Sequence, residues 1–366
     1  MPTKPSIRPG PRPIYKPNQV PRDTAASGNT LRDTTNRNPV FRLPERFFGN
    51  GPPQWTDRKK RRPPQTPEEA ATEQQKLVKY LRAAGDAQTN TPLLVPHKGG
   101  TGDHHHGLAD IIEGCRTGNQ CKSDACPNCR RALQRAIVGA FGTVQMGERF
   151  RQETGEGRSS EGRSSEWARL SIISNIRIRG GDDLVHMGRQ LRKVTQEFHG
   201  AFDQVGLSWA FGGIDVSLNI YKGHPRAIQQ NGSFRPFFQF HLYAFAPFAA
   251  AHHAKPRLKQ LFPATKVTKV PVQVSPQPYD GHPAGLAYAM KPQFTRRFTV
   301  PAHEGENGEK VRQDTRDKPL TIEEKVQLAT MLHLLGPWGR LFLHGVEVVN
   351  DGNGELVLKR YSGQTP

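Results

Sequence analysis

Two periodicities alternate between residues 167 and 297, and this alternation limits the fold more than any other feature of the sequence. Residues 168–178 carry apolar and β-branched side chains at alternate positions, which predicts a strand. Residues 184–202 carry apolar side chains at the i, i+3, i+4, i+7 spacing of an amphipathic helix. The same criteria predict strands at 208–220, 237–245 and 266–274 and a helix at 284–291. The order β-α-β-β-β-α favours an α+β fold, with helices on one face of an antiparallel or mixed central sheet.

The rest of the chain divides into segments by composition and by helix signals. Thr66 and Glu69 form a capping box that opens a helix, which we expect to stop near Gly85, and the histidines at 104–106 then fall in a loop. A second capping box begins at Thr321. We expect a disordered basic arm at 1–65, a helix and loop at 66–107, a four-cysteine zinc module with a basic helix at 108–150, a polar linker with EGRSS written twice at 151–166, the α+β core at 167–300, a loop at 301–319, and a C-terminal helix and β-hairpin at 320–366.

The charge balance points to a polyanionic partner. Of the 366 residues, 52 are Lys or Arg and 33 are Asp or Glu, a formal net charge of +19. Such an excess favours nucleic acid as the partner, although a ribosome-associated or RNA-binding protein would also be basic. No apolar run reaches the length of a membrane span, and the first residues have no apolar signal segment. We therefore expect a cytoplasmic protein, associated with a nucleoid or plasmid, that does not contact membranes.

All four cysteines lie within 15 residues, with the spacing C-x5-C-x4-C-x2-C. Four thiolates complete a tetrahedral zinc site with no open position, so the predicted role of the zinc is structural. A redox CxxC pair or unrelated buried thiols remain alternatives. Basic residues follow the cluster and could contact phosphates. The expected zinc ligands are Cys115, Cys121, Cys126 and Cys129, and the expected phosphate contacts are Arg130, Arg131 and Arg135.

Two short motifs in the core could carry chemistry on DNA. Gln239 and His241 stand at i and i+2 on a predicted strand and so share a face. Tyr288 and Lys291 stand at i and i+3 on a predicted helix and also share a face. Cleavage of a phosphodiester by transesterification needs a nucleophile, a divalent cation and a positive group near the developing charge. Further along, Phe294, Arg296, Arg297 and Phe298 interleave rings with positive charge, as in sites that stack bases and hold phosphates.

On these motifs, residues 110–297 resemble the rolling-circle replication initiators of bacterial plasmids, which belong to the HUH endonucleases. The resemblance rests on the Cys126-Pro-Asn-Cys129 knuckle with its Arg-rich helix, the strand–helix–strand order, the strand around His241, and Tyr288-Ala-Met-Lys291. It implies that the tyrosine attacks the phosphate at the nicking site and forms a 5′-phosphotyrosyl link with release of a 3′-hydroxyl. It also implies that Mg²⁺ or Mn²⁺ is held at the histidine motif, and that the lysine positions the cation or the phosphate.

The chain departs from this family at one position of its His-hydrophobic-His motif. Gln239 stands where the first histidine is expected, although a glutamine oxygen can bind a hard cation. The acidic residue often found on the preceding strand is ambiguous, with Asp215 the nearest candidate. Tyr243 and Tyr279 are alternative tyrosines. The resemblance therefore implies a plasmid or mobile-element initiator that nicks single-stranded or origin DNA, or a non-catalytic zinc-containing DNA-binding protein derived from that family.

Overall fold

The computed structural model describes residues 43, 45–48, 65–90, 101–141, 166–179, 184–221, 237–265, 268–279, 283–300, 303–304, 310–311, 314–350 and 356–360. They belong to one compact unit, Thr35–Pro366. Most of the expected basic arm, and the expected linker up to residue 165, lie outside these residues. Within the arm, Leu43 and Phe47, the latter in the 3-10 helix η1 (Glu45–Phe47), are buried in the hydrophobic core. This part of the expected disordered arm is therefore packed.

The first α-helix extends further than the sequence predicts, and the second was not predicted. Helix α1 (Pro67–Asn90) opens with the predicted capping box, in which the Glu69 amide donates to Thr66 Oγ1 over 3.2 Å. It continues through Gly85, where we expected it to stop. A Cβ at Gly85 would lie 2.5 Å from His106 Nε2, so this glycine serves the close packing of α1 on α2 (Thr101–Glu113). The three histidines at 104–106 lie in α2, and the expected loop there is wrong.

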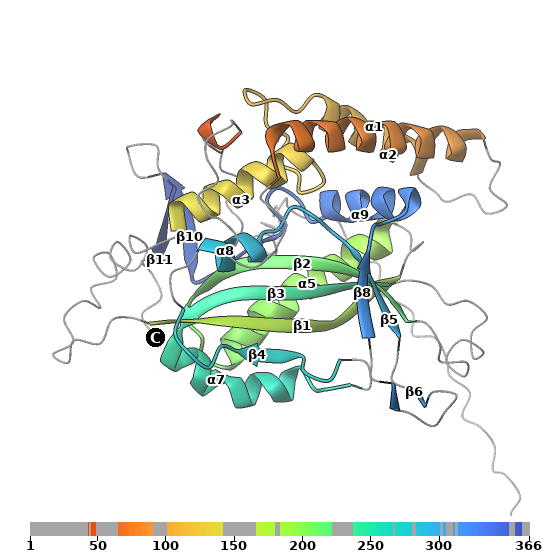
Figure 1. Cartoon of the computed structure of the whole chain (residues 1–366). Coiled ribbons are helices and arrows are strands. Elements are labelled where there is room, and N and C mark those ends of the chain that lie inside the picture. The colour runs from red at the N-terminus through yellow and green to blue at the C-terminus, as the bar shows by residue number, and fades with distance from the viewer. Residues whose placement is uncertain are drawn as a thin grey trace, which may run out of the picture. The chain divides into compact units, whose positions relative to one another are not determined.

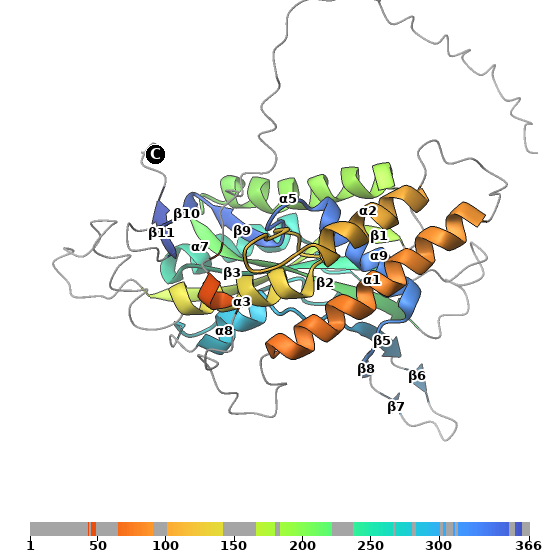
Figure 2. The same cartoon turned by 90° about the horizontal axis from the view of Figure 1, so that it is seen from above.

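The cysteine segment is not a separate module. Helix α3 (Pro127–Phe141) begins after the third cysteine and contains the fourth, and it packs against α1 and against α8 (Pro283–Ala289) of the core, as Figure 2 shows from above. Cys115, Cys126 and Cys129 belong to the same hydrophobic cluster as the side chains of the central sheet. Helix α3 and the sheet therefore share one core.

The core is a seven-stranded mixed sheet with the order β4-β1-β3-β2-β5-β8 (Figure 1). Strand β9 also pairs with β2. Its pairs are antiparallel except for β2 with β5. The expected strand at 266–274 is reduced to the three residues of β4, which lies at the sheet edge as predicted. The strands are β1 (Trp167–Arg179), β2 (Ala210–Tyr221), β3 (Phe237–Pro247), β4 (Val272–Val274), β5 (Arg296–Val300), β8 (Asp314–Lys318) and β9 (Leu341–His344).

Helices cover both faces of the sheet, whereas we expected them on one. Phe342 of β9 stands opposite Gly212 of β2, and directly opposed residues share a face. The rings of Phe342 and Phe198 are 6.4 Å apart, which places α5 (Leu184–Gln204) on that face. On the other face, a Cβ at Gly213 would lie 2.3 Å from the Ala289 carbonyl oxygen, so α8 lies directly against β2.

The chain after the core also departs from the expected loop at 301–319. Strand β8 lies in this segment and pairs with β5, and β6 (His303–Glu304) pairs with β7 (Lys310–Val311). Helix α9 (Ile322–Leu334) has the predicted capping box at Thr321, and β10 (Val346–Asn350) pairs with β11 (Leu356–Arg360) as the predicted hairpin. Helix α7 (Phe248–Leu261) was not predicted. Among the described residues, no helix has both the length and the apolarity to cross a bilayer.

Candidate functional site

The four cysteines converge on one point beside the N-terminus of α3. Their sulfur atoms all lie within 4.8 Å of one another, with Cys115 Sγ 3.4 Å and Cys121 Sγ 3.6 Å from Cys129 Sγ. None is in a disulfide. Four thiolates at the zinc–sulfur bond length of a tetrahedral site are about 3.8 Å apart, so the observed separations suit a metal. The cluster is therefore a possible metal-binding site, compatible with structural zinc.

The backbone around the cysteines is folded for this convergence. The Arg116 and Asn119 backbones exchange hydrogen bonds of 3.1 and 2.9 Å, which turns the chain back between the first two cysteines. The Cys121 amide lies 3.4 Å from Cys115 Sγ and donates to it. Hydrogen bonds among the four thiols lower the pKa of Cys115 and raise the pKa of Cys126 and Cys129.

A second set of polar side chains lies on the sheet face that α8 covers. Asp215 and Ser217 of β2 stand opposite His241 and Gln239 of β3, respectively, so all four share this face. Ser217 Oγ is 3.5 Å from His241 Nε2. Asn219 Nδ2 donates to Ser217 Oγ at 3.0 Å and to Gln239 Oε1 at 3.3 Å. Ser217, His241, Asn219 and Gln239 form one hydrogen-bonded row, and we name these four with Asp215 the sheet-face cluster.

Tyr288 and Lys291 lie over the same face. Tyr288 is in α8, and Lys291 is two residues beyond its end. Lys291 Nζ is 2.8 Å from Asp215 Oδ2, and 5.3 Å from the centre of the Tyr288 ring. The Tyr288 ring meets the Tyr243 ring edge-on with 4.9 Å between their centres. Tyr288 is 41% exposed, whereas Asp215 and His241 are buried. The two motifs named from the sequence thus meet at one place, with the tyrosine on the solvent side.

Burial sets the charge state of this site. It lowers the pKa of His241 to about 4, against the opposing effect of the Asp215 carboxylate, so the imidazole is neutral at pH 7 and keeps a lone pair. Burial, followed by the neighbouring Tyr288, raises the pKa of Tyr243. Asp215 Oδ1 is buried without a hydrogen-bond partner. A neutral imidazole and an unsatisfied carboxylate oxygen are donors that a divalent cation accepts.

An irregularity in β1 lies next to His241 and had no signal in the sequence. The pairing of β1 with β3 shifts between Ile173 and Arg177, which stand opposite His241 and Gln239. The intervening Ser174 hydroxyl and Asn175 amide donate to the Glu197 carboxylate of α5. Such a bulge changes the direction of neighbouring side chains.

The five arginines expected to contact DNA have different environments. Arg130 and Arg131 are buried, and Arg130 Nη2 bonds Glu73 at 2.8 Å while Arg131 Nε bonds the Gln65 carbonyl at 2.7 Å. Burial lowers the pKa of Arg135.

The two arginines of β5 also have different environments, since one is held by a carboxylate and the other is partly exposed. Arg296 is held by Glu324 through two hydrogen bonds of 2.7 and 2.9 Å. The Arg297 side chain is 41% exposed, and its Nε is 3.9 Å from Asp317 Oδ1. Its charge also lowers the pKa of His241, though less than burial does, so it lies near the sheet-face cluster. Of the five, Arg297 is the best placed to meet a phosphate at that cluster.

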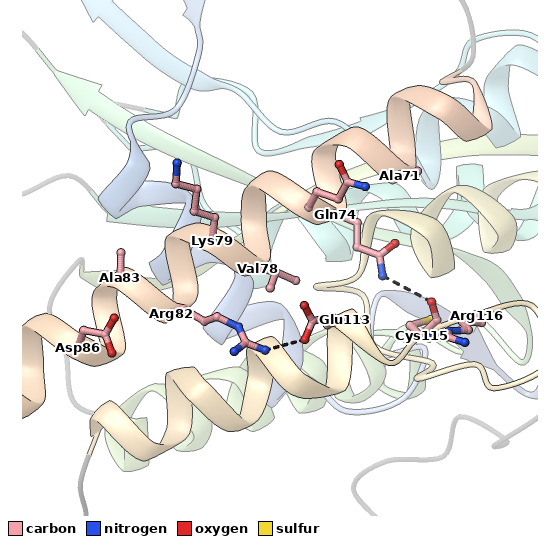
Figure 3. Close-up of a pocket in the computed structure, with 11 residues that line it drawn as sticks. Ala71, Gln74, Val78, Lys79, Arg82, Ala83, Asp86, Glu113, Cys115 and Arg116 are labelled. Atoms are coloured by element: carbon pink, nitrogen blue, oxygen red, sulfur yellow. Dashed lines mark hydrogen bonds and ion pairs between the residues drawn. The ribbon is translucent and has the colours of Figure 1, made fainter.

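A groove of about 880 Å³ lies along α1, beside the carbonyl of Cys115 (Figure 3). Arg82 closes one side of it by bonding Glu113 at 2.6 Å, and Gln74 reaches the Cys115 carbonyl at 3.5 Å. Lys79 and Arg116 also line it. No residue of the sheet-face cluster lines this groove, so it is a separate feature.

Comparison with protein-family models, with curated proteins and with solved structures finds no match for the chain.

Proposed function

We propose that the protein binds single-stranded DNA and nicks it by tyrosine transesterification, as an initiator of rolling-circle replication of a plasmid or mobile element. The observation that carries this proposal is the meeting of Tyr288, Lys291, Asp215 and His241 on one sheet face. The net charge of +19 and the exposed Arg297 add support for a polyanionic substrate.

In the proposed reaction, Tyr288 Oη attacks the phosphorus of the scissile bond. The bond from phosphorus to the 3′ oxygen breaks, the 3′-hydroxyl leaves with a proton, and the 5′ end stays on the tyrosine. The Lys291 ammonium, 5.3 Å from the Tyr288 ring, would offset negative charge on the phosphate.

His241 and Asp215 Oδ1 would hold Mg²⁺ or Mn²⁺, with Gln239 Oε1 as a further oxygen donor. When bound, the cation would polarise the scissile phosphate. We propose zinc for the four cysteines, where its role is to hold the fold.

A covalent adduct tests the nicking proposal. The protein is incubated with Mn²⁺ and a 3′-labelled pool of single-stranded oligonucleotides of random sequence, and label on the protein is measured after denaturing electrophoresis. We expect an adduct in the wild type and none in Tyr288→Phe. Tyr243→Phe and Tyr279→Phe are the matched controls and should keep the adduct. Tight DNA binding with no adduct in the wild type would exclude nicking.

A second candidate function is non-catalytic DNA binding, and the environment of Gln239 favours it. Gln239 Oε1 accepts a hydrogen bond from Asn219 at 3.3 Å, and its amide donates to Thr268 at 3.5 Å. A cation would have to replace the first of these bonds. A DNA affinity that falls steeply with salt and exceeds RNA affinity, without an adduct, would support this candidate.

A further inference from the structure

The short segment that carries Tyr288 is not stable by itself and needs contacts with the rest of the protein. Helix α8 has seven residues, which is too short to be stable alone in water. After it, the Met290 and Lys291 amides make long backbone hydrogen bonds of 3.3 Å. Contacts from other parts of the chain must therefore fix the segment from Ala287 to Lys291.

One such contact comes from the helix that begins at the cysteines. Gln134 of α3 is buried, and its Nε2 donates to the Ala287 carbonyl oxygen over 2.7 Å. Ala287 directly precedes Tyr288. Because Cys129 lies in the first turn of α3, this hydrogen bond joins the cysteine cluster to one side of the tyrosine.

The second contact holds the other side of the tyrosine through a buried arginine. Arg340 is 1% exposed, and its Nη1 donates to the Lys291 carbonyl oxygen over 3.1 Å. Its Nε donates to the Ile214 carbonyl oxygen over 2.8 Å, next to Asp215. Its Cζ also lies 4.8 Å from the centre of the Phe294 ring. Arg340 thus ties the Lys291 backbone to β2.

The cysteine loop anchors Arg340 in turn. Asp124, two residues before Cys126, is buried and accepts a hydrogen bond from the Arg340 amide at 2.9 Å. Arg130 secures this loop by donating to the Asp124 and Ala125 carbonyls at 3.1 and 3.0 Å. The path from the cysteines to Lys291 therefore consists of hydrogen bonds of 2.9 to 3.1 Å, of which only the last is partly exposed.

We propose that the cysteine cluster, when it holds its metal, positions the Tyr288–Lys291 turn, with Gln134 and Arg340 as the positioning residues that grip a carbonyl on either side of the tyrosine. The value of this positioning for catalysis rests on the proposed function, but the contacts themselves do not. Metal loss frees the cysteine loop and α3, and so releases both carbonyls.

Hydrogen exchange followed by mass spectrometry tests this coupling in the full-length protein. In the wild type, removal of the metal by a chelator should accelerate exchange in residues 283–294 by about 2- to 10-fold, the effect of losing one or two hydrogen bonds. Helix α7, which packs on β1, β3 and β4, should accelerate less than residues 283–294. Unchanged exchange in 283–294, or a uniform increase over the whole chain, would overturn the proposal.

Two variants separate positioning from general destabilisation. Gln134→Met keeps the side-chain size but loses the hydrogen bond to Ala287. Arg340→Lys keeps the charge but replaces the two nitrogens that bond the Ile214 and Lys291 carbonyls with one. With metal bound, both should already show the fast exchange in 283–294, and chelation should add little. Arg131→Lys is the matched control, since Arg131 is also buried and bonded to backbone carbonyls, but at Gln65 and Phe48. It should leave 283–294 as in the wild type, and the same acceleration in this control would contradict the proposal.

An activity measurement keeps the two proposals distinct. If the wild type forms the DNA adduct, Gln134→Met should slow adduct formation while DNA affinity and metal content stay unchanged. An undiminished rate in that variant would show that the contact does not position the tyrosine for chemistry. A wild type without any adduct would end the nicking proposal, whereas the exchange experiment would still decide the coupling.

Discussion

Lys291 and Asp215 form an ion pair in which Nζ and Oδ2 are 2.8 Å apart, with the carboxylate side chain 3% exposed and the lysine 27% exposed. A carboxylate this deep is costly unless it has a charged partner. The pair joins the segment after α8 to the middle of β2, and so fixes the place where the two sequence motifs meet.

Replacement of the lysine alone should therefore lower the free energy of unfolding more than replacement of both partners. We expect Lys291→Met to lower the free energy of unfolding by about 3 kcal/mol, because it removes the cation in direct contact with the buried Asp215 carboxylate. The double variant with Asp215→Asn should recover much of that loss. Urea denaturation of the two single variants and the double variant measures the coupling. Strictly additive effects would contradict it, and Arg297→Met, whose ion pair is partly exposed, should cost less than about 1 kcal/mol.

The cysteine cluster predicts one tightly held metal per chain. Cys126→Ser should bring the metal content near zero and lower the free energy of unfolding by at least about 3 kcal/mol, because structural zinc binding contributes roughly 10 kcal/mol to folding. Elemental analysis and thermal unfolding measure the two effects. Arg116→Ala changes an exposed side chain beside the cluster and serves as the control. A wild type that carries no metal but a reversible disulfide would favour the redox alternative.

Glu197 predicts a pH dependence of stability. Burial raises its pKa above the ordinary 4.5, against hydrogen bonds from Ser174 and Asn175. Between the unfolded and the folded pKa the folded state binds more protons, so this group makes the free energy of unfolding decrease as the pH rises through that window. Glu197→Gln cannot ionise. The difference in stability between variant and wild type should therefore shift in favour of the variant from about pH 4.5 upward and then level off. Urea denaturation across this range measures it, and parallel curves for the two proteins would refute it.

The elements that the sequence predicted correctly are those whose pattern is strong and local. Strands β1 to β3 and helix α5 follow their periodicities, and both capping boxes form as predicted. Helix α7 was missed because Pro256 lies inside it and its apolar pattern is weak. Strand β8 has the polar sequence DTRDK and is held at the sheet edge by backbone pairing with β5, which leaves no apolar alternation to detect.

The sequence predicted which site residues share a face of one strand or helix, but not which residues of different elements lie together. Strand alternation put Gln239 and His241 on one face, but the opposition of Asp215 to His241 depends on strand register, which a single strand does not encode. Arg130 and Arg131 were expected to contact phosphates, and charged residues are seldom buried, yet both are buried and bond backbone carbonyls and Glu73. Such pairings come from tertiary structure alone.

The close approach of β2 to α8 gives a last prediction. A Cβ at Gly213 would lie 2.3 Å from the Ala289 carbonyl oxygen and 2.4 Å from Met290 Sδ, and the backbone oxygen cannot move away without shifting α8. We expect Gly213→Ala to lower the free energy of unfolding by roughly 2 kcal/mol, typical of overpacking, and to displace Tyr288 so that the DNA adduct is reduced. Gly200→Ala in α5 is the matched control, since nothing lies within 4 Å of its Cβ position, and it should stabilise the protein by up to about 1 kcal/mol. Urea denaturation and the adduct assay compare the two variants. Equal stabilities for both would mean that α8 does not lie as close to β2 as described, and that Tyr288 is not held against the sheet-face cluster.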